Sequence, residues 1–236
     1  MATPILEVKN LVAGYRDAIV LHDISLQLDD GGRLAILGRN GVGKTTLLLA
    51  IMGLADIKGG SIFYKGQDIT RWPAHRRALA GLGWVAQERE IFPTLTVDEN
   101  LVTTSRPGRW DLKSVYELFP RLYERRANKG NQLSGGEQQM LAFGRTLMTN
   151  PAVLLLDEPL EGLAPVIVEE LTAAISRMMS EGGMSLALVE QHTDIALEMT
   201  EKAVVIERGR IAYAAGSREL SLDQAALDRY VGLAIE

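Results

Sequence analysis

Short runs of hydrophobic residues, separated by glycine-rich turns, make up the first third of the chain. Residues 5–8, 24–28 and 61–64 have the length and the hydrophobic alternation of strands, and Asp30-Gly31-Gly32 and Gly59-Gly60 interrupt the pattern between them. Alternating strands of this kind are typical of antiparallel pairing with one solvated face. We therefore predict a small antiparallel sheet from these three segments.

Between these segments lies a strand followed by a helix. Residues 33–37 form an apolar run of strand length, and a glycine-rich turn comes next. Residues 44–52 are apolar enough for a buried helix, which Gly53 can close in the left-handed conformation. The pattern predicts a strand, loop and helix unit.

The second half of the chain continues this alternation. Two apolar runs, 153–156 and 186–189, are too short for helices and lie on either side of a helical stretch from about 166 to 180. Such alternation predicts a parallel sheet covered by helices. Near the end, two further apolar runs flank an Arg-Gly turn and predict a hairpin, residues 203–207 and 210–214.

The middle of the chain has a mostly helical pattern. Thr96-x-x-Glu99 and Ser134-x-x-Glu137 are capping boxes, which open helices. We interpret residues 88–150 as a helical insertion in one α/β domain, whose core is made by residues 1–87 and 151–236.

Composition narrows the class of protein. The 236 residues are 47% hydrophobic and 23% charged, as in an ordinary globular protein. The net charge of -5 provides no overall cationic field for nucleic acid, so we expect no nucleic-acid partner. The absence of cysteine suits a reducing compartment. Residues 1–7 do not resemble a signal segment, and no apolar run approaches the roughly 18 residues of a membrane helix. We expect a cytoplasmic protein that contacts membranes through partners.

The turn after the predicted strand 33–37 carries a phosphate-binding pattern. It has the form glycine, four residues, Gly-Lys-Thr, and lies between a strand and a helix as the motif requires. Backbone N–H groups of such a loop surround phosphate, Lys44 reaches the outer phosphates, and the Thr45 hydroxyl ligates Mg²⁺. A plain glycine turn with a surface lysine is the alternative, and the context disfavours it. The predicted nucleotide contacts are Gly38, Arg39, Asn40, Gly41, Val42, Gly43, Lys44, Thr45 and Thr46.

Two carboxylates follow the predicted strand 153–156. Ligands bind at the carboxyl ends of strands in open α/β sheets, which places Asp157 near Mg²⁺. Glu158, one residue further, is the natural group to deprotonate an attacking water. Taken alone, a pair that marks the solvent end of a strand would be the commoner explanation. The phosphate loop favours the catalytic interpretation.

The segment Leu133-Ser134-Gly135-Gly136-Glu137-Gln138-Gln139 resembles the signature motif of ABC-type ATPases. Ser134 caps a helix whose first turn offers exposed N–H groups, which make a second anion site. A plain capping box is the alternative, but the order after the phosphate loop and before the carboxylates favours the signature. The resemblance implies a P-loop core of ABC type with an antiparallel β-subdomain and an inserted helical subdomain. It also implies ATP and Mg²⁺ as cofactors.

In that family the signature closes on ATP held by the phosphate loop of a partner. The resemblance therefore implies a head-to-tail dimer, formed with a second copy or with a sibling ATPase. The signature residues expected to contact that nucleotide are Ser134, Gly135, Gly136 and Glu137.

Three smaller motifs of the family match positions in this chain. Tyr15 resembles the aromatic that stacks on adenine, and a packing tyrosine is the alternative. Gln87 resembles the glutamine that senses Mg²⁺ and joins the core to the helical insertion, although Ala86 replaces the usual proline. His192 resembles the switch histidine that contacts the terminal phosphate, and the other two histidines lack its placement after a strand. The resemblance thus implies Glu158, His192, Gln87 and Lys44 as catalytic residues, and Thr45, Gln87 and Asp157 as the metal site.

The segment 160–165 occupies the place of the loop that contacts the opposite subunit. Many relatives carry Ser or Thr where this chain has Leu160, and Asp where it has Ala164, so both positions depart from the family pattern. Together with segments 89–97 and 138–142, it resembles the ATPases of branched-chain amino acid importers, most of all their shorter subunit.

These resemblances imply an ATP-driven transport subunit. It would lie on the cytoplasmic face of the membrane, bind membrane-spanning permease subunits near Gln87 and residues 91–97, and depend indirectly on a solute-binding protein. Importers for urea and lipopolysaccharide-extracting ATPases are close alternatives. An ABC ATPase acting on ribosomes or DNA is a further one, although such proteins usually carry tandem domains or coiled coils.

Overall fold

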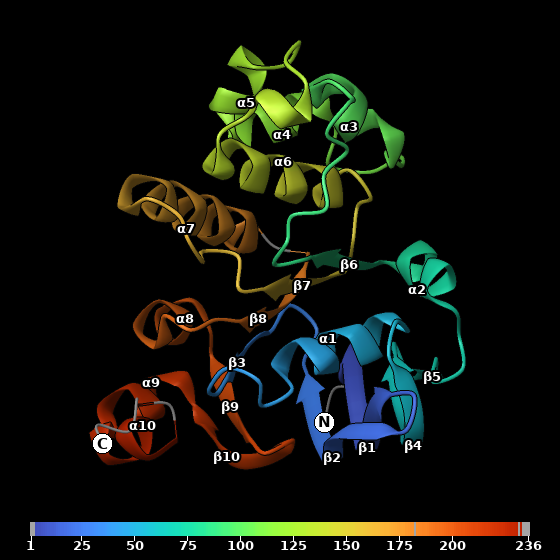
Figure 1. The fold of residues 1–236 in the computed structure, drawn as a ribbon, viewed down its shortest axis with the longest axis vertical. Coiled ribbons are helices and arrows are strands. Elements are labelled where there is room, and N and C mark those ends of the chain that lie inside the picture. Colours follow the sequence, from blue (N-terminus) through green and yellow to red (C-terminus); the bar gives the residue numbers. More distant parts are fainter. Residues whose placement is uncertain (1–2, 182, 231, 233–236) are drawn as a thin grey trace.

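The antiparallel sheet lies at one end of the molecule (Figure 1). The computed structural model describes residues 3–181, 183–230 and 232, so the first two residues of the N-terminal segment considered above lie outside it. The strand order is β2-β1-β4-β5, and all neighbouring pairs are antiparallel. The predicted small sheet is therefore present, with longer strands than expected. They are β1 (Leu6–Tyr15), β2 (Ala18–Leu28), β4 (Asp56–Tyr64) and β5 (Gln67–Asp68).

A six-stranded sheet forms the centre of the molecule. Its strand order is β10-β9-β3-β8-β7-β6; all neighbours are parallel except β10, which pairs antiparallel with β9. The parallel sheet and the C-terminal hairpin were both predicted. The strands are β3 (Arg33–Leu37), β6 (Leu82–Val85), β7 (Val153–Asp157), β8 (Ser185–Val189), β9 (Lys202–Glu207) and β10 (Arg210–Gly216). Because β3, β8 and β7 are neighbours, the loops after them meet at one edge.

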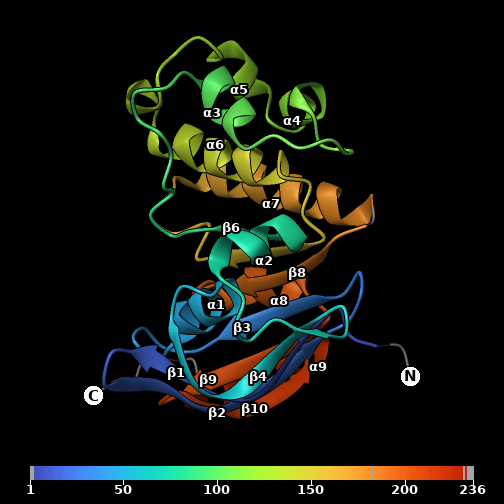
Figure 2. The same cartoon turned by 90° about the vertical axis from the view of Figure 1, so that its right-hand side faces the viewer.

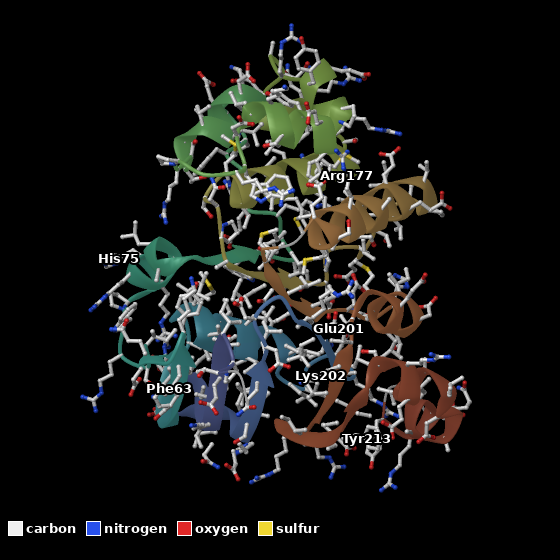
Figure 3. The ribbon with its side chains drawn as sticks, turned by 180° about the vertical axis from the view of Figure 1, so that it is seen from behind. Phe63, His75, Arg177, Glu201, Lys202 and Tyr213 are labelled. Atoms are coloured by element: carbon white, nitrogen blue, oxygen red, sulfur yellow. The ribbon has the colours of Figure 1, made fainter. Side chains whose placement is uncertain are left out.

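The opposite edge of this sheet, where the parallel strands begin, is held by ion pairs. Glu201 precedes β9 and accepts hydrogen bonds from the backbone and side chain of Arg33, both at 2.9 Å. Lys202 lies next to Glu201 (Figure 3) and pairs with Asp29 at 2.6 Å. This edge is therefore structural, and the chemistry lies at the other edge.

Helix α1 (Lys44–Met52) lies between the two sheets. It begins and ends at the predicted residues, and Gly53 closes it with φ 77°. One hydrophobic core joins α1 to the inner faces of both sheets. The buried Arg77 of α2 (Ala74–Ala80) donates to the last carbonyls of α1, those of Ala50 at 2.8 Å and Ile51 at 2.7 Å. These contacts anchor the C-terminal end of α1, opposite the end that carries the phosphate loop.

Helices form the other half of the molecule (Figures 1 and 2). A second core packs them against the other face of the six-stranded sheet. Both predicted capping boxes are present, at the starts of α3 and α6. The helices of this half are α3 (Val97–Thr103), α4 (Leu112–Leu118), α5 (Pro120–Glu124) and α6 (Gly135–Leu147), with a 3-10 turn at Gly130–Gln132. Helix α7 (Pro165–Ser180) lies between them and the sheet.

Three short helices complete the chain: α8 (Thr193–Met199), α9 (Ser217–Leu222) and α10 (Gln224–Tyr230). They gather beside β9 and β10 in Figure 1. Among the described residues, no helix has the length and apolar character needed to cross a bilayer.

Candidate nucleotide site

The loop between β3 and α1 is a tight backbone cradle. Gly43 has φ 111°, a conformation that favours glycine, and a Cβ atom there would lie 2.7 Å from Leu21 Cδ2, so a larger residue would also have to displace that side chain. Lys44 is only 4% exposed and folds back over the loop. Its Nζ donates to the carbonyl oxygens of Gly38 at 2.9 Å and Arg39 at 3.2 Å. The loop thus holds its lysine where it can reach a phosphate bound by the N–H groups of the helix start.

Asp157 ends β7 inside the protein, facing this loop. It is fully buried, and its Oδ1 accepts a hydrogen bond from the Thr45 hydroxyl at 3.1 Å. Its other oxygen, Oδ2, is buried without a hydrogen-bond partner among the described residues. Burial raises the pKa of Asp157 to about 6, because the charged form is poorly solvated there. The Asp157 Oδ2 atom is therefore available to bind a cation.

These two residues fit Mg²⁺. The ion prefers oxygen ligands and is usually held by one or two protein groups together with phosphate oxygens. The unpartnered oxygen of Asp157 and the adjacent Thr45 hydroxyl supply that number. In the described part of the chain no cluster of three or more carboxylates or histidines is placed to hold a metal alone. An ion here would therefore depend on bound phosphate.

Glu158 stands at the mouth of the loop in a constrained backbone. Its φ is 46°, a left-handed value that costs a non-glycine residue about 1–3 kcal/mol and is common at functional sites. Its N–H bonds the carbonyl of Val189 at 2.8 Å, which fixes it between β7 and β8. Its side chain is 7% exposed, and Lys44 Nζ lies 3.3 Å from its Oε1.

Two side-chain amides also hold Glu158. Gln87 Nε2 donates to its Oε2 at 3.4 Å and also bonds Glu161. Gln191 Nε2 donates to the same oxygen at 2.6 Å. Gln87 follows β6 and Gln191 follows β8, so loops from three strands converge on one carboxylate. The carboxylate that was predicted to activate water is therefore the centre of the cluster.

A pocket of about 480 Å³ opens over this cluster. It is large enough for the polyphosphate end of a nucleotide. Its lining includes most of the predicted phosphate-loop residues and also Val20, Glu161 and Gln191, which were not predicted. The lining residues are Val20, Asn40, Gly41, Gly43, Lys44, Thr45, Thr46, Gln87, Glu158, Glu161 and Gln191.

Tyr15 and His192, both predicted to contact nucleotide, do not line this pocket. Tyr15 ends β1 and is 42% exposed, and its hydroxyl donates to Thr46 Oγ1 at 3.4 Å. Its contact with adenine stays a prediction. His192 is exposed and lines a different hollow, of about 950 Å³, between α8, α9 and α10. The structure does not bring the His192 side chain into the phosphate-loop pocket. His75, on α2, is exposed at the periphery (Figure 3).

The segment predicted to be the signature lies apart from this pocket. Ser134 caps α6 and exchanges hydrogen bonds with Glu137, and Ser134 and Gly135 are exposed. Residues 133–139 are absent from the lining of the phosphate-loop pocket. The exposed N-terminus of α6 therefore takes no part in the phosphate-loop pocket of its own chain.

One buried acid was missed by sequence reasoning. Glu190 follows β8, is 1% exposed, and accepts backbone N–H groups from Leu160 at 2.9 Å, Gln191 at 2.9 Å and His192 at 3.2 Å. Burial raises its pKa, against the effect of these bonds. Its placement one residue past an apolar strand, parallel to that of Glu158, was the available signal.

The comparisons with known proteins agree with this geometry. A family model described as ABC transporter matches residues 21–161. The high-affinity branched-chain amino acid transport ATP-binding protein BraG of Pseudomonas aeruginosa is 38% identical over 92% of this chain and 95% of its own. The probable branched-chain amino acid transport ATP-binding protein LivF of Archaeoglobus fulgidus is 34% identical over 91% and 93%.

A solved structure shows the same fold. It is the crystal structure of a nucleotide-free ATP-binding cassette from an ABC transporter, with a TM-score of 0.80, 25% identity and coverage of 93% of this chain and 94% of that chain. The predicted family and fold class are confirmed. The chain belongs to the ABC transporter family, and it is an ATPase of that family.

Proposed function

We propose that this chain is the ATP-hydrolysing subunit of an importer for branched-chain amino acids. It works on the cytoplasmic face of the membrane beneath membrane-spanning permease subunits, and a solute-binding protein delivers the cargo. The observation that carries the ATPase part is that Lys44 and Glu158 meet at one pocket, while Asp157 lies buried behind it on the Thr45 hydroxyl. The names and near-complete coverage of the two relatives support the cargo.

Two copies, or this chain and a sibling, bind ATP between them. The phosphate loop of one subunit holds the triphosphate, and the exposed start of α6 in the other covers it. This arrangement gives a purpose to a helix N-terminus that remains exposed and lies outside the pocket of its own chain. The Ser134 and Glu137 capping box keeps that first turn ordered before the partner arrives.

Binding of ATP rearranges the cluster at the mouth. Lys44 leaves the carbonyls of Gly38 and Arg39 and the carboxylate of Glu158 for phosphate oxygens. Glu158 is then free to accept the proton of a water aligned with the terminal phosphate. Mg²⁺, held by Thr45 and Asp157, neutralises phosphate charge when bound. The partner's signature excludes bulk water from the closed site.

The link to the membrane runs through residues 89–97, which follow Gln87. Arg89 reaches α6 and donates to Gln139 Oε1 at 3.2 Å, while Arg145 of α6 donates to the carbonyl of Glu90 at 2.6 Å. The segment is thus tied to the helix that carries the signature. Phe92 is 41% exposed on it, under the Arg145 guanidinium. We place the permease contact here, and infer that residues 88–150 transmit the stroke as a unit.

Reconstitution tests the proposal. The chain is copurified with its membrane proteins, placed in liposomes with ATP inside, and supplied with its solute-binding protein outside. We expect uptake of labelled leucine, and loss of uptake in Lys44→Ala because the phosphate loop loses its cation. Uptake of urea but not leucine would contradict the cargo. Copurification with ribosomes or DNA, without membrane proteins, would contradict the transport role.

A further inference from the structure

Two adjacent residues after β8 differ in their access to the phosphate-loop pocket. Gln191 lines both that pocket and the hollow between α8, α9 and α10, whereas His192 lines only the hollow. Gln191 Nε2 lies 2.6 Å from Glu158, while no hydrogen bond of the His192 side chain links it to that cluster among the described residues. His192 was predicted from the sequence because it is a histidine, but the fold brings Gln191 to Glu158.

Glu190 fixes the backbone turn that directs the Gln191 side chain towards Glu158. One carboxylate oxygen of Glu190 accepts the backbone N–H groups of both Gln191 and His192, and the other accepts that of Leu160. A buried carboxylate with three N–H donors is a strong restraint on backbone direction. It ties the loop after β8 to the segment after Glu158, and it leaves the Gln191 side chain aimed at the pocket.

The hydrogen bonds of Gln191 join the two sides of the pocket. Its Nε2 donates to the carboxylate of Glu158, which can only accept, so the amide orientation follows from chemistry. Its Oε1 then accepts from Asn40 Nδ2 in the phosphate loop, at 3.5 Å. A side chain in this position contacts the group that activates water and the loop that holds phosphate.

We infer that Gln191, and not His192, is the residue that reads the terminal phosphate in this ATPase. The inference rests on the proposed function and concerns the same site. The amide has two N–H donors, so it can keep one on Glu158 and give the other to a terminal phosphate oxygen. The amide remains neutral throughout the physiological pH range, so Gln191 adds no pH dependence to the rate of ATP hydrolysis.

The test compares single variants in the full transporter complex. Gln191→Ala lowers kcat for ATP by about 10- to 100-fold, with KM changed by less than about threefold, because the lost contact matters most in the transition state. His192→Ala causes a clearly smaller loss. Gln67→Ala, which removes an exposed amide from β5, controls for surface truncation, and thermal melting checks that each variant is folded.

A pH profile gives a second readout. Gln191→His restores part of kcat and adds an inflection at about pH 6.5, the ordinary pKa of histidine, to the pH profile of the unmodified protein. A loss in His192→Ala equal to or greater than that in Gln191→Ala would overturn the inference, as would normal kcat in Gln191→Ala. A wild-type complex without ATP turnover would overturn the proposed function as well, so the two failures are distinguishable.

Discussion

Some hydrogen-bonding atoms of the charged residues at the nucleotide site have no partner. Lys44 has three oxygen partners, whereas Asp157 has one oxygen bonded to Thr45 and the other buried without a partner in the described structure. A buried, incompletely bonded carboxylate costs free energy of folding. At this position the cost prepares the site for a cation, because binding the ion relieves it.

Asp157→Asn should expose that cost. The pKa of Asp157 is raised to about 6 from an ordinary value of 3.8, so the folded protein gains stability from the protonated form at low pH and loses it as pH rises towards 6. Asparagine does not ionise. We expect the variant to exceed the original protein in free energy of unfolding by about 3 kcal/mol at pH 7 and to come close to it near pH 4. Urea unfolding without nucleotide measures this.

A difference that stays constant from pH 4 to pH 7 would contradict this account of Asp157. The same variant should lose ATPase activity, since we propose that Asp157 binds Mg²⁺. Greater stability with lost activity separates a binding role from a structural one.

Residues whose role is set by local pattern were predictable from the sequence. The phosphate loop, Asp157 and Glu158 belong to motifs in which spacing alone determines position, and they meet as expected. Gln191 was not predictable, because a histidine stood beside it and the direction of each side chain depends on the turn held by Glu190. That turn joins segments 30 residues apart.

At the scale of elements, the segment that connects Gln87 to the helical half is a braced loop. Asn100 of α3 is fully buried and donates to the carbonyls of Phe92 at 3.0 Å, Leu95 at 3.2 Å and Thr96 at 2.9 Å, while its Oδ1 accepts the Phe92 N–H at 2.9 Å. The side-chain amide of Asn100 thus supplies hydrogen bonds to residues 92–96, which form no helix or strand. A rigid loop of this kind can transmit force between α6 and a permease.

Asn100→Ala tests this brace. It leaves the Phe92 N–H without its partner, while the three carbonyls each keep a backbone donor, so we expect a loss of about 1–3 kcal/mol in the free energy of unfolding. In the reconstituted complex, amino acid uptake per ATP hydrolysed should fall, because ATP binding stays intact while the loop softens. Asn131→Ala, at an exposed position nearby, is the control. Unchanged stability and unchanged coupling would remove Asn100 from this role.

Some helix and strand boundaries are set by the local sequence, and others by contacts with distant residues. Strand β3 and helix α1 match their predicted residues, because an apolar run and Gly53 set both ends. Within residues 88–150 only the capping boxes were specific. The break between α4 and α5 falls at Phe119-Pro120, and the buried Phe119 packs there against Phe143 of α6. That contact is invisible in local pattern.

At the scale of the whole molecule, the two half-sites lie on different parts of the fold. The phosphate loop lies between the two sheets, and the signature opens α6 in the helical half (Figure 1). The core of the helical half continues through α7 to β7 and β8. A change at Glu158 therefore has a packed route to the helices, and we propose that a second subunit completes each site.

The most direct test is the mass in solution of Glu158→Gln, which we expect to bind ATP without activating water. Light scattering with ATP and Mg²⁺, alone and with the partner proteins supplied, should show a complex of two ATPase subunits that dissociates when ATP is removed. Adding Ser134→Arg should abolish that pairing while each chain still binds ATP. An ATP-loaded Glu158→Gln protein that remains a monomer even with its partners, or pairs equally well with Ser134→Arg, would contradict the shared site.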